Sequence, residues 1–198
     1  MLVLAADTSL PILSVALIRD RALIGALAME GKGSRNEKLL PAIDWLLTEN
    51  AIDRKQIDLF AVTRGPGSFT GVRIGLATLQ GLGVALQRPV CTMSTHEAIA
   101  HETRGRVVIR DDAGRGEFYV SVFEDGREVI APHLAREMND ANIIDVADVM
   151  QRDNVALRCA RRAIEIEQRG EGERYRDVTP IYVRLAEAEV KLRQKQNE

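Results

Sequence analysis

The chain has few aromatic, cysteine and histidine residues, and each shortage excludes a class of function. Phe, Trp and Tyr make up 4% of the 198 residues, which argues against the stacking platforms of single-strand nucleic-acid binders. The two cysteines, Cys91 and Cys159, fit buried or free thiols in a reducing compartment better than a disulfide framework. Of the three histidines, His96 and His101 would point about 140° apart on a helix and His133 is isolated, so we expect surface or loop histidines and no metal site.

Neither sign of charge dominates the chain. Lys and Arg number 27 against 29 Asp and Glu, a net charge of −2, so no global field attracts nucleic acid. No apolar run approaches the roughly 20 residues of a membrane span, and the first residues do not form a signal sequence. With 45% hydrophobic residues the chain can bury an ordinary core. We expect a soluble, cytoplasmic protein.

The most informative segment is a glycine-rich turn at residues 64–75. It lies between an apolar run with strand character, 59–63, and an apolar run typical of a helix, 72–86. Such a turn exposes backbone N–H groups at the positive end of a helix, where an anion or a close-packed partner can lie. Glycines such as Gly65 and Gly67 indicate positive φ angles or close backbone approach. No Lys-Ser/Thr pair follows, so the turn is not a P-loop; a structural turn and a phosphate site both stay open.

Two stretches of the chain repeat the same order of features: strand, acid, strand, acidic turn, strand. Asp7 in the first corresponds to Asp112 in the second, and Asp20 corresponds to Asp125 with the same spacing. Self-similarity at a long period predicts two related lobes rather than an array of short repeats.

The repeated plan resembles the α/β fold of actin, the sugar kinases and Hsp70 (the ASKHA fold): a meander with an acid at its first turn, then helix, strand and helix. We predict a first lobe at residues 1–103, a reduced second lobe at 104–181, and a terminal helix in 182–198 that packs back on the first lobe. We predict that the second lobe is reduced, because the chain after residue 135 is mostly polar and no second glycine turn precedes a helix there.

In a fold of this kind the two acid-bearing hairpins would face each other across a phosphate cleft. The alternative for the first hairpin is an Asx-type turn, in which the acid and two hydroxyls satisfy backbone donors. Both hypotheses stay open. The candidate nucleotide-binding residues are Asp7, Thr8, Ser9, Gly65, Gly67 and Ser68.

The two predicted first-lobe helices are a candidate interface. In the second helix Ala77, Gly81 and Ala85 recur every fourth residue, and small side chains at this spacing let another helix approach closely. That neighbour could be the protein's own first helix or a partner. The candidate interface residues are Leu39, Leu40, Ile43, Leu47, Gly75, Ala77, Thr78, Gly81, Leu82 and Ala85.

Five segments, in order and spacing, resemble the family of bacterial tRNA threonylcarbamoyladenosine biosynthesis proteins called TsaB. The glycine turn alone is shared with the catalytic relative TsaD, whereas the short length and the Pro-x-Tyr-x-Arg ending are typical of TsaB. The segments are residues 7–9 with 14–17, 39–41, 65–75, 112–119 and 180–184.

The resemblance implies a non-catalytic subunit of the machine that places threonylcarbamoyl on the adenosine beside the tRNA anticodon. TsaD carries the metal and the transfer chemistry, and a TsaB-type chain pairs with TsaD through its two first-lobe helices. The ATPase TsaE joins the pair, and without TsaD the same face can form a homodimer. The resemblance implies no catalytic residue, metal or cofactor of its own, with ATP or ADP only at a site shared with partners, tRNA reached only through the complex, and no membrane.

The sequence departs from the family pattern at three places. Arg35-Asn36 replaces a usual His-Ser, Gly114 stands where Arg is common, and a Gly-x-Gly loop is missing between residues 135 and 170. Two alternatives come from other classes. A free-standing ATPase or kinase of this fold needs a second phosphate loop, and a metalloprotease needs a His/Glu metal set.

A predicted helix in the last third of the chain carries several basic residues. The interpretation from charge pattern is a solvated surface rather than an RNA contact. These residues are Arg158, Arg161, Arg162 and Arg169.

Overall fold

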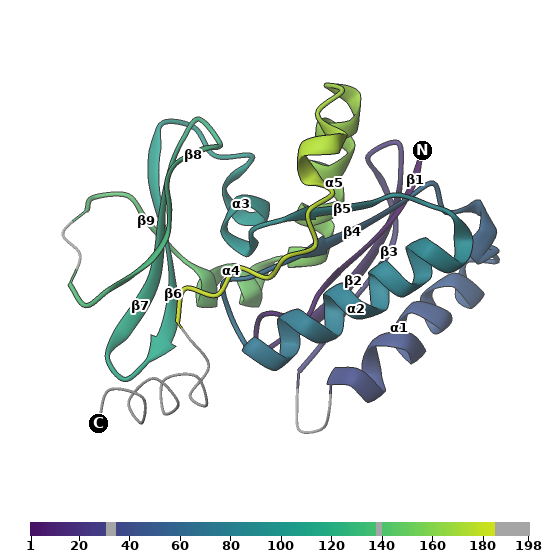
Figure 1. Ribbon diagram of the computed structural model, residues 1–198, viewed down its shortest axis with the longest axis horizontal. Coiled ribbons are helices and arrows are strands. Elements are labelled where there is room, and N and C mark those ends of the chain that lie inside the picture. The colour runs from purple at the N-terminus through teal and green to yellow at the C-terminus, as the bar shows by residue number, and fades with distance from the viewer. Residues whose placement is uncertain (31–34, 138–139, 185–198) are drawn as a thin grey trace, which may run out of the picture.

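The computed structural model describes residues 1–30, 35–137 and 140–184, with only the backbone for 35 and 36. The described chain contains two β-sheets with helices packed around and between them (Figure 1). The predicted α/β duplicated fold is confirmed. The expected terminal helix lies outside the described residues from residue 185 onward.

The first sheet has five strands in the order β3-β2-β1-β4-β5. The first three form an antiparallel meander, and β4 and β5 run parallel to β1, as helical crossovers require. Their bounds are β1 (Leu2–Asp7), β2 (Leu13–Arg19), β3 (Ala22–Met29), β4 (Leu59–Thr63) and β5 (Val90–Met93).

Helices cover both faces of the first sheet (Figure 1). On one face α1 (Arg35–Glu49) and α2 (Phe69–Leu86) pack over alternate β1 residues such as Leu4. On the other face α5 (Val155–Gln168) packs over the intervening ones, such as Val3. Strands buried on both faces appear in a sequence as continuous apolar runs, which is why residues 2–6 lack alternation.

The second sheet has four strands in the order β8-β7-β6-β9. It repeats the first sheet: three antiparallel strands, with a fourth parallel to the first of them, β6. Within the described residues, no helix lies between its third and fourth strands and no strand corresponds to the fifth strand of the first sheet. The bounds are β6 (Arg106–Gly114), β7 (Glu117–Glu124), β8 (Arg127–Ala135) and β9 (Ile143–Asp145), followed by α4 (Val146–Arg152).

The hairpin turns carry the clearest trace of the repeat. Asp20 and Arg21 have φ angles of 48° and 73°, and Asp125 and Gly126 have 49° and 74°. Two successive positive φ angles are typical of a type I′ hairpin turn. The predicted correspondence of Asp20 with Asp125 is therefore confirmed at the level of backbone conformation.

The place of α5 differs from the predicted lobe boundary. This helix was expected within the second lobe, 104–181, yet it packs on β1, β2 and β4 of the first sheet. The reason is its strong amphipathic pattern, with an apolar stripe that includes Ala156, Cys159 and Ala163, all fully buried. Small side chains on that stripe let the helix lie close to the sheet.

Helix α1 contains a proline, and helix α2 corrects a further expectation. The first helix begins at Arg35 and continues through Pro41, whose exposed ring removes one helical donor. Helix α2 has 18 residues and a mean hydropathy of 1.3, enough by length and composition for a membrane span. It packs on β4 and α1, and 33% of this stretch is buried.

Candidate functional site

The glycine turn is held against the β1–β2 hairpin. Gly65 and Gly67 have φ angles of 95° and 146°, as their sequence predicts. A Cβ atom on Gly67 would lie 2.5 Å from the Ser9 carbonyl oxygen, and one on Gly71 would lie 2.0 Å from that of Thr8. Close approach of the protein's own backbone therefore requires both glycines.

Hydrogen bonds complete this contact. The Ser68 N–H donates to the Ser9 carbonyl at 2.7 Å, and the Thr8 hydroxyl donates to the Gly71 carbonyl at 2.6 Å. Ser68 is also the N-cap of α2, accepting the Gly71 N–H at 3.2 Å. These hydroxyl and amide groups, which the sequence predicted as candidate phosphate ligands, thus form hydrogen bonds within the chain.

Asp7 lies at the centre of this contact and is fully buried. Its carboxylate accepts hydrogen bonds from the Ser9 hydroxyl at 2.7 Å, from the Leu10 N–H at 3.3 Å and from the Thr63 hydroxyl. Burial raises the pKa of Asp7, and these donors oppose the rise. The contacts fit the Asx-type turn hypothesis, whereas the nucleotide hypothesis stays a prediction.

The second acid is Asp111 rather than Asp112, which corrects the predicted pairing. Asp111 is buried, and desolvation, with the charge of Asp7 among the further causes, raises its pKa to about 7. Asp112 is exposed and accepts the Gly114 N–H at 2.7 Å. Side chains alternate along a strand, so a shift of one residue exchanges the inward and outward positions.

Residues 177–184, here called the connecting segment, begin beside the glycine turn. The Arg64 guanidinium contacts the Asp177 carboxylate at 2.9 Å, and the Ile181 N–H donates to the Arg64 carbonyl at 2.7 Å. This end of the segment is therefore fixed to the residue that opens the turn.

The connecting segment then crosses the start of α2. The Tyr182 ring stacks on the Phe69 ring with centroids 4.6 Å apart, and the Arg73 Nε donates to the Tyr182 hydroxyl at 2.7 Å. The Arg73 guanidinium lies 3.9 Å from the Phe69 centroid, a cation–π distance.

The segment ends on the second sheet, where Arg184 donates to the Ala113 carbonyl at 2.8 Å and pairs with the Glu117 carboxylate. Figure 1 shows this stretch, in yellow, running from the first sheet to the lower end of β6 and β7. The Pro-x-Tyr-x-Arg ending and the segment 112–119 thus meet in space. Sequence reasoning found both as family signatures; it gave the ending no role, and it gave the hairpin of Asp112 only a place beside a phosphate cleft.

Two of the histidines are buried, which contradicts the expected surface positions. His96 and His101 lie on or just after α3 (Thr95–Ala100), in contact with the second sheet and α5. The His96 Nδ1 is 2.7 Å from the Ser121 hydroxyl, and burial lowers the His96 pKa to about 3. Across residues 1–30, 35–137 and 140–184, no group of three or more His, Cys, Asp or Glu side chains could hold a metal ion. Cys91 and Cys159 are buried and free, as predicted.

The expected solvated basic face on α5 is wrong for Arg162. This side chain is buried and donates to the Glu97 carboxylate at 2.8 Å and the Tyr175 hydroxyl at 3.2 Å. Tyr175, in the 3-10 turn η2 (Gly172–Tyr175), also donates to Glu97 at 2.9 Å. The network joins α3, α5 and η2. The sequence did contain a signal for this burial, because Arg162 lies on the apolar side of the predicted helix.

The candidate interface residues separate into two groups. Leu39, Ile43, Leu47 and Gly75 are buried in the protein's own core. A Cβ atom on Gly75 would lie 2.4 Å from the Thr8 hydroxyl, so this glycine serves an internal contact and not an exposed face. The structure therefore places Leu39 and Gly75 inside the fold, whereas Ile43 and Leu47 also line the groove described below and stay predicted interface residues.

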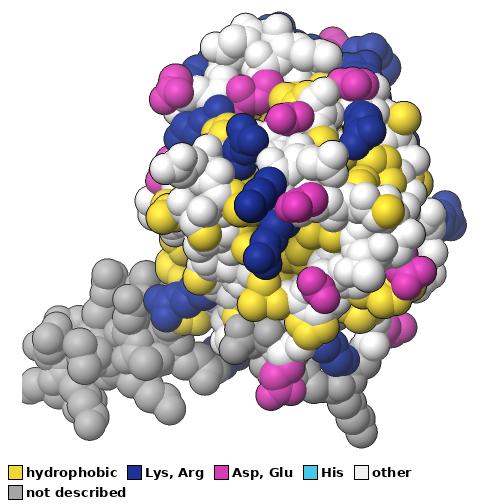
Figure 2. All heavy atoms as spheres, turned by 90° about the vertical axis from the view of Figure 1, so that its right-hand side faces the viewer, with side chains coloured by type: hydrophobic (Ala, Val, Ile, Leu, Met, Phe, Trp, Pro, Cys, Tyr) yellow, Lys and Arg dark blue, Asp and Glu magenta, His cyan; other side chains and the backbone are white. Residues whose placement is uncertain are grey.

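The remaining candidates face solvent. Leu40 is 51% exposed, and a Cβ atom on Gly81 would meet nothing within 4 Å. Ala77, Gly81 and Ala85 are exposed, and Thr78 and Leu82 are half-buried. Large apolar side chains that the prediction missed join them, Trp45 at 52% and Val84 at 75% exposed. Figure 2, the side on which the C-terminal halves of α1 and α2 lie, shows apolar side chains gathered around a few charged ones.

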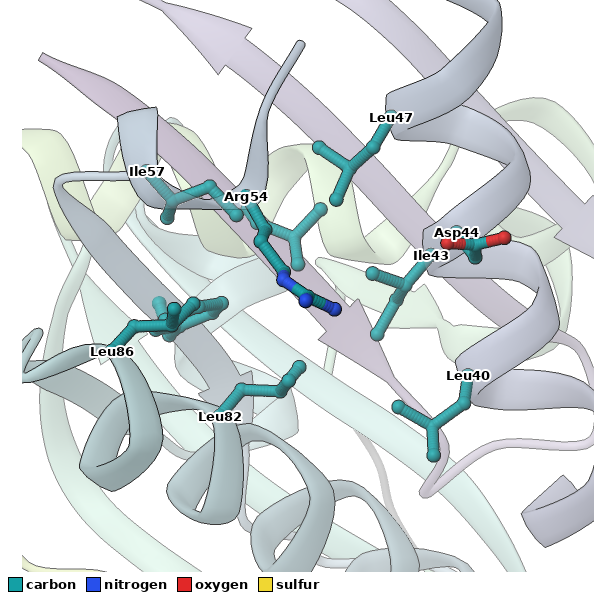
Figure 3. A pocket seen from close by; sticks show the side chains of 10 residues that line it. Leu40, Ile43, Asp44, Leu47, Arg54, Ile57, Leu82 and Leu86 are labelled. Carbon is teal, nitrogen blue, oxygen red and sulfur yellow. The ribbon is translucent and has the colours of Figure 1, made fainter.

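A groove runs between the two helices, with a volume of about 170 Å³. The 3-10 turn η1 (Arg54–Gln56) closes one end, and the first sheet forms the floor. Figure 3 shows the aliphatic side chains that point into this space. The groove is lined by Leu4, Leu40, Ile43, Asp44, Leu47, Arg54, Ile57, Phe60, Leu82 and Leu86. We call the exposed residues of α1 and α2, together with this groove, the α1/α2 face.

Comparisons with known proteins agree with the fold and the motifs. Residues 33–170, more than half of the chain, match the family model of TsaD, tRNA N6-adenosine threonylcarbamoyltransferase. The YeaZ structure from Pseudomonas aeruginosa superposes with a TM-score of 0.71 at 28% identity, covering 91% of this chain and 99% of that one.

Named relatives are tRNA threonylcarbamoyladenosine biosynthesis proteins TsaB. The Escherichia coli (strain K12) protein is 33% identical over 152 residues, 69% of this chain and 65% of that protein. The Haemophilus influenzae protein is 37% identical over 126 residues, 60% of this chain and 52% of that protein. The chain thus spans less than two thirds of the length of these curated relatives. On the match to the family model, with the fold and the named relatives in agreement, the chain belongs to the TsaD family and, within it, to the TsaB (YeaZ-type) proteins.

Proposed function

We propose that this chain acts in tRNA threonylcarbamoyladenosine biosynthesis as a non-catalytic subunit that binds and activates a TsaD-type transferase subunit. The observation that carries the proposal is the α1/α2 face, in which Leu40, Trp45 and Val84 are each about half exposed or more. Figure 2 shows apolar side chains gathered on this side of the molecule, and exposed apolar surface of this kind marks an interaction site. The names of its relatives supply the biological process.

The chemistry of the face fits a helical partner. Burying a large apolar side chain completely is worth roughly 1.5–3 kcal/mol, so three half-exposed ones can contribute several kcal/mol toward the cost of association. Ala77, Gly81 and Ala85 leave a shallow strip along α2, and a partner helix can approach closely along such a strip.

The proposal extends to the other partners of such a complex. A TsaE-type ATPase would join the pair, tRNA would be reached only through the assembled complex, and ATP or ADP would bind at a site shared between subunits. Support for a shared rather than a private nucleotide site comes from Asp7, Thr8 and Ser9, whose side chains already bond within the chain. In the absence of TsaD the α1/α2 face would form a homodimer, and the complex would work in the cytoplasm.

The decisive experiment is co-purification with TsaD after Gly81→Leu or Ala77→Arg. Both sites are exposed and Gly81 has open space around it, so the fold should survive, as a retained melting temperature would show. We expect both variants to lose TsaD. Ala131→Arg, on the exposed side of β8, is the matched control and should bind normally. Retained pairing in both α2 variants would refute the interface.

Two rival functions have their own measurements. Nucleotide turnover by the isolated chain would favour a free-standing ATPase or kinase, and stoichiometric metal in the purified chain would favour a metalloprotease. Within the described residues no metal-binding group of His, Cys, Asp or Glu supports the second.

A further inference from the structure

The groove on the α1/α2 face is the right size for one large apolar side chain. Its volume of about 170 Å³ is close to that of an apolar protein cavity, about 150 Å³, that binds benzene. Its walls are Ile43 and Leu47 of α1 and Leu82 and Leu86 of α2, so an entering Leu, Met or Phe side chain would contact hydrocarbon on both sides.

A single cation lies over this apolar space. Figure 3 shows the Arg54 side chain extending from η1 across the opening, between Leu82 and Ile43. Arg54 has no ion pair or side-chain hydrogen bond with any residue in the described part of the chain. Asp44 also lines the groove, but no ion pair joins it to Arg54 within the described residues.

Hydrogen bonds of the turn η1 fix the backbone position of Arg54. Asp53 caps η1 by accepting the Lys55 N–H at 2.8 Å, and Gln56 returns the contact by accepting the Asp53 N–H at 3.0 Å. The Arg88 guanidinium ties the turn to the end of α2 by donating to the Lys55 carbonyl at 3.2 Å. The guanidinium therefore starts from an ordered turn next to Ile57, which is buried.

We infer that the occupant of this groove is a partner helix that inserts one large apolar side chain between α1 and α2 and presents a carboxylate to Arg54. The inference rests on the proposed function, because it specifies the partner surface that the α1/α2 face selects. Covering Arg54 with an apolar helix would strip water from an unpaired charge, which is costly. A carboxylate on the partner removes that cost, since carboxylate and guanidinium form paired hydrogen bonds.

The geometry of a helix places both groups together. Residues three or four apart lie on the same side of a helix, so the apolar anchor and the acid are expected one turn apart on the partner. The anchor supplies affinity, and the acid sets orientation along the groove, because electrostatic complementarity fixes register more than it adds affinity.

The test measures binding of the chain to its TsaD at low and high salt by titration calorimetry. Arg54→Glu should weaken binding about tenfold or more at low salt, and the difference from the unmodified chain should shrink as salt screens the charges. Arg54→Met keeps most of the aliphatic stem and should weaken binding less. Lys55→Glu is the matched control: it makes the same charge change on the neighbouring exposed residue, outside the groove lining, and should change binding by no more than about twofold.

A second measurement identifies the partner's acid directly. The double variant R54K/K55R puts one amine at the groove and removes the adjacent one. Carbodiimide coupling, which joins an amine to a carboxylate in direct contact, should then give one dominant cross-link, located by mass spectrometry to an acidic residue on a helix of TsaD. A cross-link to a second copy of the chain, with TsaD in excess, would overturn the choice of occupant.

Failures of the two proposals can be told apart. If Arg54→Glu and Lys55→Glu bind TsaD equally at low salt while Gly81→Leu does not bind, the carboxylate inference is wrong and the α1/α2 interface stands. If the unmodified chain shows no binding to TsaD at micromolar concentrations, both proposals are wrong.

Discussion

The two sheets share a strand order but differ in what covers them. In the first sheet, α1 and α2 pack on one face and α5 on the other. In the second, residues such as Ile109 and Phe123 pack against α3, α4 and the start of α5. Its other face carries a cluster of strand residues around Val120. Within the described residues, the first sheet is covered by helices on both faces and the second on one face, and it is the first sheet that carries a pair of long helices, α1 and α2, side by side on one face.

The two halves also differ in how their first hairpins, β1–β2 and β6–β7, are held in place. In the first half Asp7, Thr8 and Ser9 are locked onto the glycine turn by short hydrogen bonds. In the second half the corresponding hairpin is held from outside, by Arg184 of the connecting segment. The glycine turn therefore holds the first hairpin in place, and the connecting segment holds the second.

The largest effect is expected where the first hairpin meets α2. Gly71→Ala would place a Cβ atom 2.0 Å from the Thr8 carbonyl oxygen, so the hairpin must move. We expect a loss of more than about 4 kcal/mol of stability, or insoluble protein. Gly81→Ala, the same change in the same helix where a Cβ meets nothing, should instead stabilise by roughly 0.5–1 kcal/mol. Thermal denaturation of both variants tests the contrast, and equal effects would contradict it.

A smaller effect is expected at the joint between the halves. Arg162→Met leaves the Glu97 carboxylate, whose side chain is only 15% exposed, without its cation, and removing one member of a buried pair costs about 3 kcal/mol or more. Arg21→Met breaks an ion pair with Glu165, which lies on the same helix as Arg162. The Arg21 side chain is 56% exposed, so this loss should cost less than about 1 kcal/mol. Urea denaturation of both variants gives the two free energies. A loss at Arg21 as large as that at Arg162 would show that burial does not set the cost.

The smallest effect concerns the second half alone and depends on pH. The pKa of Asp111 is raised from 3.8 to about 7, so the folded state holds a proton that the unfolded state releases. Its stabilising contribution is present below about pH 4 and is lost as the pH rises through about 7. Asp111→Asn should therefore stabilise by about 1–2 kcal/mol at pH 8 and have little effect at pH 4. Melting temperatures at the two pH values test this. A gain at pH 4 as large as that at pH 8 would contradict the assignment.

The opposite sign is expected for His96, which gives an internal control. Burial lowers the His96 pKa from 6.5 to about 3, so its contribution to stability is present above about pH 6.5 and is lost as the pH falls toward 3. In the Asp111→Asn variant this loss is no longer opposed by Asp111. The variant should therefore lose stability on acidification more steeply than the unmodified chain.

Much of the fold could be predicted because it depends on local features. Continuous apolar runs indicated the buried strands, and the spacing of Asp20 and Asp125 indicated the repeat. The glycines Gly65 and Gly67 indicated positive φ angles, all of which the structure confirms. Each of these signals acts within a few residues, where sterics and hydrogen bonding of the backbone limit the choices.

Less of the candidate site could be predicted, because it depends on which residues meet. Leu39 and Leu40 are adjacent in sequence, yet one is buried and the other is half exposed. Trp45 and Val84 were missed, since an apolar residue on a helix gives no sign of whether its own sheet or solvent lies opposite. Arg54 was missed because its importance comes from the two helices that bring leucines beneath it.

The amino-acid sequence by itself determined the strands, the two matching hairpin turns, the glycine turn and the family, because these are recorded in residue types at short and regular spacings. Only the tertiary structure decided that Asp111 rather than Asp112 is buried, that His96 and Arg162 are buried, and that Gly75 is internal whereas Gly81 is open. The physical reason is that a side chain is buried only where two elements pack against each other. A helix or strand specifies its own pattern of side chains, but the side that loses its water is chosen by the element that packs against it.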